Sequence, residues 1–250
     1  MPRRLKILAC ALVSLPCARG TAAEPPSYDV FRAAGAIVVD GRLDEPAWQA
    51  APSVGPFVFP WHTAGDREQT DAKLLWDDEN LYVSFVCQDA HISVEQTEHD
   101  APVYQDDCVE VFTSPDPART ERYFNIEMNV GGAFLDRYHP NGPGQSPEWD
   151  ASGVKIATSV LGTLNNDDDQ DQSWTLEAAI PFSNFASVAK RAPPRDGDMW
   201  RLNLNRLGGK VNAQHSQWSR GMTPRPSFHT PDTFGQVHFR DSTPPARRSP

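Results

Sequence analysis

The sequence has few cysteines, no zinc-binding motif and no long apolar run. Two of its four cysteines, Cys10 and Cys17, lie within the first 23 residues. The seven histidines are scattered, and no C-x-x-C, H-E-x-x-H or H-x-H pattern occurs, so a catalytic zinc site is not expected. No run of about 20 apolar residues is present, which argues against a transmembrane helix.

Basic residues are also scarce relative to acidic ones. The chain holds 23 Lys and Arg against 33 Asp and Glu, which gives a formal net charge of −10. Nucleic acids and anionic membranes require a positively charged protein face, so both are unfavourable partners. A neutral ligand or a cation is favoured instead.

The N-terminus has the pattern of a secretion signal. Arg3, Arg4 and Lys6 precede a short apolar stretch over residues 7–15, and small residues at 21–23 offer a cleavage site. We therefore predict a signal peptide over residues 1–23 and an exported protein, either periplasmic or extracellular. The two cysteines outside this segment, Cys87 and Cys108, could pair in an oxidising compartment, but the sequence leaves their separation open.

Short β-rich runs separated by turn formers dominate the remaining chain. With 23 Pro and 16 Gly and no long helical periodicity, this pattern predicts an all-β fold. We expect a single-domain β-sandwich of two antiparallel sheets over residues 24–242, with a disordered tail over 243–250. We also expect the protein to be a monomer. The predicted strands are 81–87, 107–112, 122–130, 153–160, 173–180, 199–207 and 234–239, and the candidate short helices are 45–51 and 181–189.

Three predicted strands alternate apolar and polar residues, which places polar side chains on one sheet face. Amide and carboxylate groups on rigid strands can pair with sugar hydroxyls, which are donors and acceptors at once. Alternatively, these polar residues could lie on a solvent-exposed outer face of the sheet. Asn is depleted in strands, however, so several Asn at outward strand positions favour a binding role. The polar residues concerned are Glu110, Asn125, Glu127, Asn203 and Asn205.

The ordered motifs resemble those of the carbohydrate-binding module family nine-like proteins, in the DOMON-like β-sandwich superfamily. The first motif is I-V-V-D-G-R-L-D-E-P-A-W at 37–48, and A-K-L-L-W-D-D-E-N-L-Y-V follows at 72–83. Later motifs are D-D-C-V-E-V-F at 106–112, W-T-L-E-A-A-I-P-F at 174–182 and F-G-Q-V-H-F at 234–239. The resemblance spans nearly the whole chain after residue 36.

This resemblance implies a non-catalytic module that clamps a sugar between two aromatic rings. The ring positions correspond to Tyr104, where relatives often have Trp, and to Trp218. The polar contacts correspond to Glu110, Asn125 and Glu127, with Asn125 in place of a family arginine. Calcium is common in the family, and Asp89, Asp106 and Asp107 could contribute ligands. The acidic run 167–171 is a second candidate, although a solvated loop explains it as well.

Two alternatives stay open at the level of sequence. Related sandwich domains bind haem through Met and His or Lys ligands, but no pair stands out by spacing here, and no haem is expected. A glycoside hydrolase would use two opposed carboxylates, for which Glu110 and Glu127 are the candidates. The resemblance instead favours a non-enzymatic protein that binds an oligosaccharide or polysaccharide, alone or as an accessory to a glycoside hydrolase.

Overall fold

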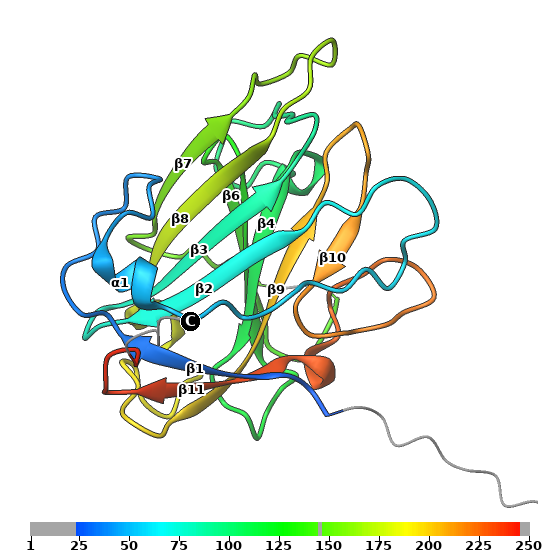
Figure 1. Cartoon of the computed structure of the whole chain (residues 1–250). Helices are drawn as coiled ribbons and strands as arrows, with labels where there is room; N and C mark the ends of the chain where they lie inside the picture. Colours follow the sequence, from blue (N-terminus) through cyan, green and yellow to red (C-terminus); the bar gives the residue numbers. More distant parts are fainter. Residues whose placement is uncertain (1–23, 145–146, 246–250) are drawn as a thin grey trace, which may run out of the picture.

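The computed structural model describes residues 24–144 and 147–245 (Figure 1). The predicted signal peptide, and residues 246–250 of the predicted tail, lie outside the described residues. The strands are β1 (Ser27–Arg32), β2 (Thr70–Trp76), β3 (Asn80–Gln88), β4 (Cys108–Ser114), β5 (Tyr123–Asn129), β6 (Phe134–His139), β7 (Lys155–Leu161), β8 (Ser173–Pro181), β9 (Met199–Leu207), β10 (His215–Gln217) and β11 (Gly235–Arg240). The helical elements are α1 (Pro46–Ala50) and the 3₁₀ turns η1 (Val103–Gln105), η2 (Phe182–Phe185) and η3 (Pro231–Thr233).

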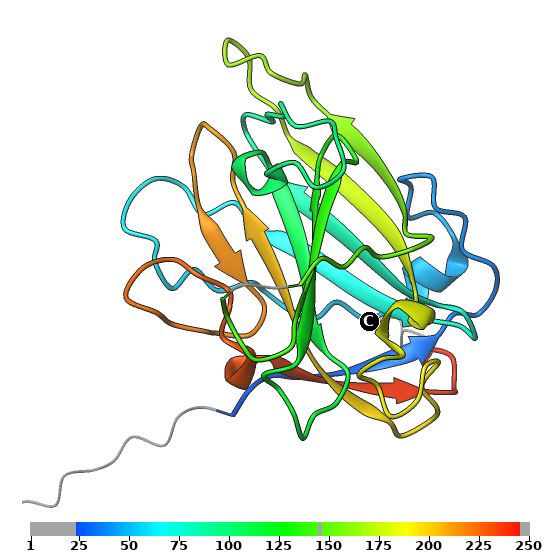
Figure 2. The ribbon, with the colours of Figure 1, turned by 180° about the vertical axis from the view of Figure 1, so that it is seen from behind.

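The strands form two layers of one curled sheet. One layer contains β7, β8, β3 and β2, and the other contains β6, β5, β4, β9 and β10 (Figures 1 and 2). The pair β1 and β11 joins the layers, because β11 pairs with β9 while β1 pairs with β2. The predicted sandwich is confirmed, but its two layers are continuous, and β1 runs parallel to both of its neighbours.

The hydrophobic core lies between the two layers. Strand β5 contributes Phe124, Ile126 and Met128, each at most 1% exposed, and β8 contributes Trp174 and Leu176 from the other side. Alternate residues of each strand point into this core, as the period of two predicts. Cys87 belongs to this core and Cys108 to a separate cluster on the other face of β4, and both thiols are free.

The outer face of the β2–β3–β8 layer is covered by α1. Trp48 of this short helix is completely buried, and its indole Nε1 donates a hydrogen bond to Glu177 Oε1 at 2.7 Å. Ala47 and Ala51 pack beside it against Leu75 and Tyr82. Among the described residues, no helix has the length and apolar character needed to cross a membrane.

The predicted elements correspond closely to the observed ones. The predicted strand 199–207 matches β9, and the other predicted strands overlap β3, β4, β5, β7, β8 and β11. The helix predicted at 45–51 is α1, whereas 181–189 forms only the 3₁₀ turn η2. Strands β1, β2, β6 and β10 were not predicted. The edge strands β6 and β10 are short, six and three residues long, and carry little alternation.

Candidate functional site

The register of β4, β5 and β9 brings the predicted polar residues together on one face. Glu110 lies opposite Glu127 on β5 and opposite Asn205 on β9. These side chains point away from the core of the sandwich, since their neighbours Val109 and Val111 point into it. The prediction of a shared polar face is therefore met, although all of its residues are buried beneath loops. Figure 2 shows this layer from the side of those loops.

A pocket of about 280 Å³ opens over this face. This volume is near the lower end of the range for small-molecule sites and suits one compact ligand unit. Glu110 and Glu127 form its polar floor, and Tyr104, which is 46% exposed, stands at its rim from η1. The remaining lining residues are Phe112, Leu207, His215, Pro226, Ser227, Phe228 and His229.

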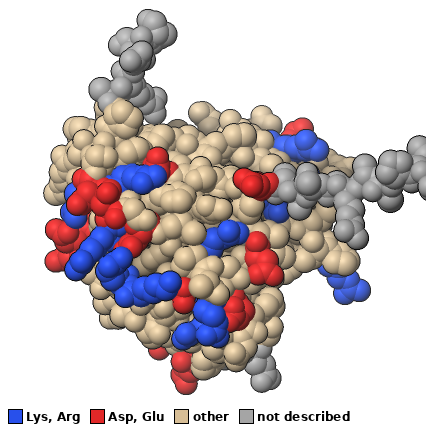
Figure 3. Space-filling model, turned by 90° about the horizontal axis from the view of Figure 1, so that it is seen from below, with Lys and Arg blue, Asp and Glu red and all other residues tan. Residues whose placement is uncertain are grey.

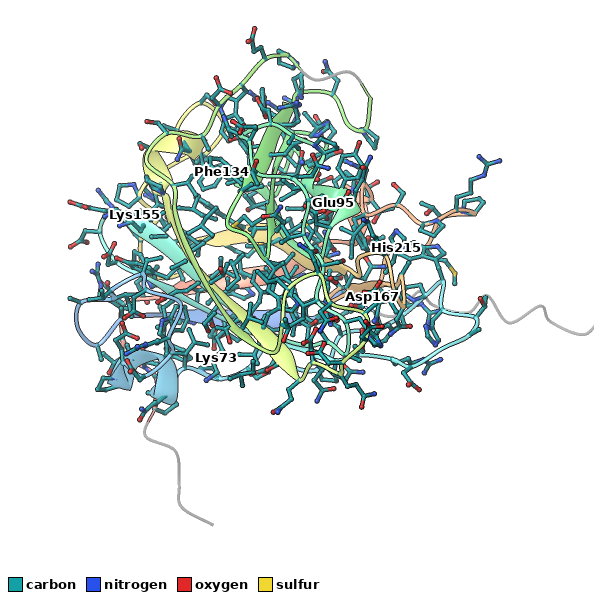
Figure 4. The ribbon with its side chains drawn as sticks, turned by 90° about the horizontal axis from the view of Figure 1, so that it is seen from above. Lys73, Glu95, Phe134, Lys155, Asp167 and His215 are labelled. Carbon is teal, nitrogen blue, oxygen red and sulfur yellow. The ribbon has the colours of Figure 1, made fainter. Side chains whose placement is uncertain are left out.

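The segment Pro226–His229 was missed by the sequence analysis. It belongs to the loop between β10 and η3, and it contributes four of the ten lining residues. Phe228 is 4% exposed and packs with Phe112 and Tyr123 on the outer face of the layer. His215, labelled in Figure 4, is the first residue of β10 and also lines the pocket. The sequence offers one weak indication of a binding role for this segment. Phe228 and His229 are adjacent in a loop that is rich in proline.

A hydrogen-bonded network supports the two glutamates. Asn205 Nδ2 donates to Glu110 Oε2 at 3.1 Å, and Asn125 Nδ2 donates to Glu127 Oε1 at 2.8 Å. His139 is hydrogen-bonded in turn to Asn125 Oδ1 at 2.8 Å. Asn125 and Asn205 thus position the carboxylates, and they are not themselves among the residues that line the pocket.

Tyr123 links this network to the loop above it. Its ring stacks on His139 with centroids 4.4 Å apart, and its hydroxyl is hydrogen-bonded to His229 Nδ1 at 2.7 Å. The loop residue His229 is thereby attached to the sheet, which helps to define one wall of the pocket.

Glu127 and Asn205 each have one buried acceptor atom without a partner among the described residues. These atoms are Glu127 Oε2 and Asn205 Oδ1. Unpaired buried acceptors are costly, so a bound molecule with suitable donors would stabilise them. The arrangement can therefore receive hydrogen-bond donors, which is the chemistry of sugar hydroxyl and amino groups.

Burial also changes the acidity of the two glutamates. Burial raises the pKa of Glu127 to about 7, and the nearby Asn125 and Arg137 oppose this effect. Burial and the charge of Glu127 raise the pKa of Glu110 well above its ordinary value. The pair therefore holds protons more tightly than exposed glutamates do.

Asn203 lies on the same face but is fully engaged by the protein. Its Nδ2 donates to Gln217 Oε1 at 3.1 Å and to the Ser219 carbonyl at 3.0 Å. Its Oδ1 accepts a hydrogen bond from the Ser219 amide at 2.8 Å. We predicted Asn203 as a sugar ligand, and the structure shows it holding the chain that follows β10.

The prediction that Trp218 stacks on a sugar is wrong. Its side chain is 5% exposed and belongs to the hydrophobic core between the layers. The indole Nε1 donates to the Val54 carbonyl at 2.9 Å, and the ring lies against Gly235, where any side chain would collide with it. The polar residue before it, Gln217, takes the outer face instead. Of the two predicted rings, only Tyr104 lies at the pocket.

The three predicted calcium ligands are used by protein donors. Asp89 Oδ2 accepts hydrogen bonds from Arg206 Nη2 at 2.8 Å and from Trp174 Nε1 at 3.1 Å. Asp107 accepts from the amides of Ser93 and Gly209, both at 2.8 Å. Asp106 accepts from the backbone of residues 95 and 96 and from an Asn129 amide. These carboxylates hold loops and Arg206, and they are not among the described groups of three or more ligand atoms close enough to share an ion.

A different group of side chains has the spacing of a metal site. Ligand atoms of His99, Asp100, Asp136 and Asp150 lie within 4.8 Å of one another. Asp136 is completely buried, and its Oδ1 has no hydrogen-bond partner. In the part of the chain that the structure describes, this is the one group of three or more such residues close enough to share an ion.

The acidic loop between β7 and β8 lies at the loop-rich end of the sandwich. Figure 4 shows Asp167 on the same side of the molecule as Glu95 and His215. Asn165 of this loop accepts a hydrogen bond from the Val94 amide at 2.9 Å, and Asp171 accepts one from the Ile92 amide at 2.8 Å. Glu95 forms an ion pair with Lys210. The hydrogen bonds of Asn165 and Asp171 attach this loop to the segment 92–94.

A second pocket, of about 680 Å³, lies at the other end of the molecule. Of its charged side chains, Arg32 pairs with Asp78 and Asp241, each at 2.8 Å, and Arg191 pairs with Asp198 outside the pocket. Figure 3, seen from below, shows basic and acidic side chains intermixed on this side of the protein.

Comparison with solved structures supports the sandwich fold. A Bacteroides uniformis protein solved as a candidate carbohydrate-binding protein superposes with a TM-score of 0.70 at 22% identity, covering 87% of this chain and all of that one. A carbohydrate-binding module of family 9 from Caldicellulosiruptor kristjanssonii, in complex with cellotriose, gives 0.61 at 17% identity over 90% of this chain and all of that one. Its complex with glucose gives 0.58 at 17% identity over 88% of this chain and all of that one.

Sequence comparison gives a curated relative and a family. The relative is the exoglucanase XynX of Acetivibrio thermocellus, which is 24% identical over 151 residues. That match covers 60% of this chain but only 12% of the exoglucanase. The profile of carbohydrate-binding family 9 matches residues 54–239. This range excludes β1, contains β2 to β10 in full, and contains β11 except for its last residue. The chain therefore belongs to carbohydrate-binding family 9.

Proposed function

We propose that this chain is an exported, non-catalytic protein that binds a carbohydrate in the pocket over β4, β5 and β9. The observation that carries the proposal is the pairing of buried, strand-held carboxylates with an aromatic rim. Glu110 and Glu127 supply acceptors for hydroxyl groups, and Tyr104 offers a half-exposed ring to the apolar face of a sugar. Family membership supports the same ligand class.

The pocket favours one sugar unit, as at the end of a chain, over a long stretch of polysaccharide. Its volume of about 280 Å³ is small, and the loop 226–229 closes one side. The glucose and cellotriose bound by the Caldicellulosiruptor module are reasonable first probes on this basis. A glycan-array screen followed by calorimetry on the full chain tests the proposal. Absence of binding to every glycan would contradict it.

A role beside a glycoside hydrolase follows from the exoglucanase relative. Because the match covers only 12% of that enzyme, we carry over no activity and infer only an accessory role. The pair Glu110 and Glu127 also resembles a glycosidase dyad in residue type. An assay of reducing-sugar release therefore belongs with the binding test, and turnover that is lost in E110Q would contradict a non-catalytic role. An absorption spectrum without a Soret band would exclude the haem alternative.

A structural calcium ion remains part of the proposal, at a different place from the one predicted. Carboxylate oxygens are suitable calcium ligands, and Asp136 has a buried oxygen without a partner. We therefore assign the ion to the carboxylates of Asp100, Asp136 and Asp150, beside His99, rather than to Asp89, Asp106 and Asp107.

A further inference from the structure

The described residues that line the pocket include two carboxyl groups but no lysine or arginine. Glu110 and Glu127 are 3% and 6% exposed, and they face each other across the β4–β5 ladder. The positive charge that acts on Glu127 is Arg137 on β6. Its Nη1 is already bonded to Asp100 Oδ1 and to the Asp136 carbonyl, both at 2.6 Å. The acidic pair thus lacks a cation inside the pocket.

The nearby histidines do not supply the missing charge. His215 and His229 line the pocket, and His139 lies behind it in the hydrogen-bonded network. Burial lowers the pKa of all three, and that of His139 falls to about 4. They are therefore mainly neutral at pH 7.

The site contains hydrogen-bond acceptors that a ligand with donor groups could satisfy. Glu127 Oε2 and Asn205 Oδ1 are buried acceptors without a partner. An ammonium group has three donors and no acceptor, and its hydrogen bonds to carboxylates are stronger than those of a neutral hydroxyl. Tyr104, Phe112 and Phe228 surround the same space, and aromatic faces attract cations.

We propose that the sugar bound here carries a free ammonium group, with that group between Glu110 and Glu127. The ligand class is thus an amino sugar, or a glycan that ends in one. This inference rests on the proposed sugar-binding function and makes it more specific. The net charge of −10 adds to it, because it favours the approach of cationic ligands.

Calorimetry at pH 7 on the full chain tests the proposal with four probes. Glucosamine carries the ammonium, N-acetylglucosamine has the same ring without the charge, glucose lacks the nitrogen, and methylammonium lacks the sugar. We expect glucosamine to bind at least about tenfold more tightly than each of the other three, because charge-assisted hydrogen bonds are the stronger ones.

The variant E127Q keeps the shape of the side chain and removes the carboxyl group that an adjacent ammonium would hold in its ionised form, because a nearby positive charge lowers the pKa of a carboxyl group. It should reduce the preference for glucosamine over glucose about tenfold or more. The matched control is E79Q, because Glu79 is an exposed residue in the turn between β2 and β3 of the other layer. E79Q should keep the preference unchanged. Circular dichroism confirms that each variant is folded, and E110Q provides a second test of the same charge.

The outcomes separate this inference from the function on which it rests. Glucose or N-acetylglucosamine binding as tightly as glucosamine would overturn the ammonium assignment and leave sugar binding in place. Methylammonium binding as tightly as glucosamine would overturn the assignment of a sugar. If no sugar on the array or in the calorimeter binds, both proposals are overturned. An unchanged preference in folded E127Q and E110Q would also overturn the assignment.

Discussion

Glu110 on β4 and Glu127 on β5 lie directly opposite each other, and both are almost completely buried. Two carboxyl groups in this arrangement repel each other when both are ionised. The protein keeps them beside neutral partners, Asn205 and Asn125, which donate one hydrogen bond to each. This relationship makes both stability and binding depend on pH.

Stability should fall as the pH rises through the titration of this pair. Burial raises the pKa of Glu127 from 4.5 to about 7, so between these values the native state binds a proton that the unfolded chain has released. The free energy of unfolding therefore decreases as the pH rises across this range, by about 1 to 3 kcal/mol for this group. Urea unfolding at pH 5 and pH 8 measures the change.

The variant E127Q should show a smaller pH dependence than the wild type, whereas E79Q should match the wild type. Burial also raises the pKa of Asp107 to about 7, so Asp107 makes stability fall with rising pH in the same way. The comparison between E127Q and the wild type is therefore needed to isolate the contribution of Glu127. Equal slopes in E127Q and the wild type would show that Glu127 does not titrate in this range.

Replacing Trp218 should destabilise the fold and leave the pocket intact. Its ring fills space in the core against Gly235, so W218A would create a cavity and lower the free energy of unfolding by about 3 to 5 kcal/mol. Chemical denaturation gives this value, and calorimetry on the folded fraction should give an unchanged sugar affinity. A large loss of affinity without loss of stability would restore the stacking role.

Replacing Tyr104 should have the opposite effect. Its ring is 46% exposed at the rim of the pocket, so Y104A removes contact with the ligand but little packing. We expect a loss of binding free energy of about 1 kcal/mol, or roughly fivefold in Kd, with nearly unchanged stability. L161A is a suitable control, since Leu161 is exposed on β7 of the other layer. Wild-type affinity in Y104A would remove this ring from the site.

Asp89 should be essential for stability because it compensates a buried charge. Arg206 has no exposed surface, and its Nη2 lies 2.8 Å from Asp89 Oδ2. D89N would leave the guanidinium without its main partner and cost about 3 to 5 kcal/mol of stability. D168N, in the exposed acidic loop, is expected to unfold like the wild type. A stable D89N protein would show that Glu68, 3.7 Å from Arg206, suffices as its partner.

Calcium should raise the Tm of the wild type but not of D136N. This result follows if the ion is held by the carboxylates of Asp100, Asp136 and Asp150, since Asp136 supplies a buried oxygen without a partner among the described residues. Thermal unfolding with calcium and with a chelator gives the comparison, and D168N serves as the control. A calcium effect that persists in D136N would place the ion elsewhere.

The sequence alone determined which residues of each strand face the core. Alternation over Phe124–Met128 and Trp200–Leu204 is a local property with a period of two, so it predicts both faces without knowledge of the partner strand. It therefore also predicted that Glu110, Asn125, Glu127, Asn203 and Asn205 share one side of a layer. The motifs of the family gave the same β-sandwich independently.

Only the tertiary structure decided which of those residues can meet a ligand. The register that sets Glu110 opposite Glu127, and the folding of the loop that carries Phe228 over them, depend on contacts between residues distant in the chain. Trp218 shows the limit clearly. A shift of one residue in a strand reverses the face of a side chain, so nothing local separates an indole in the core from one in the pocket.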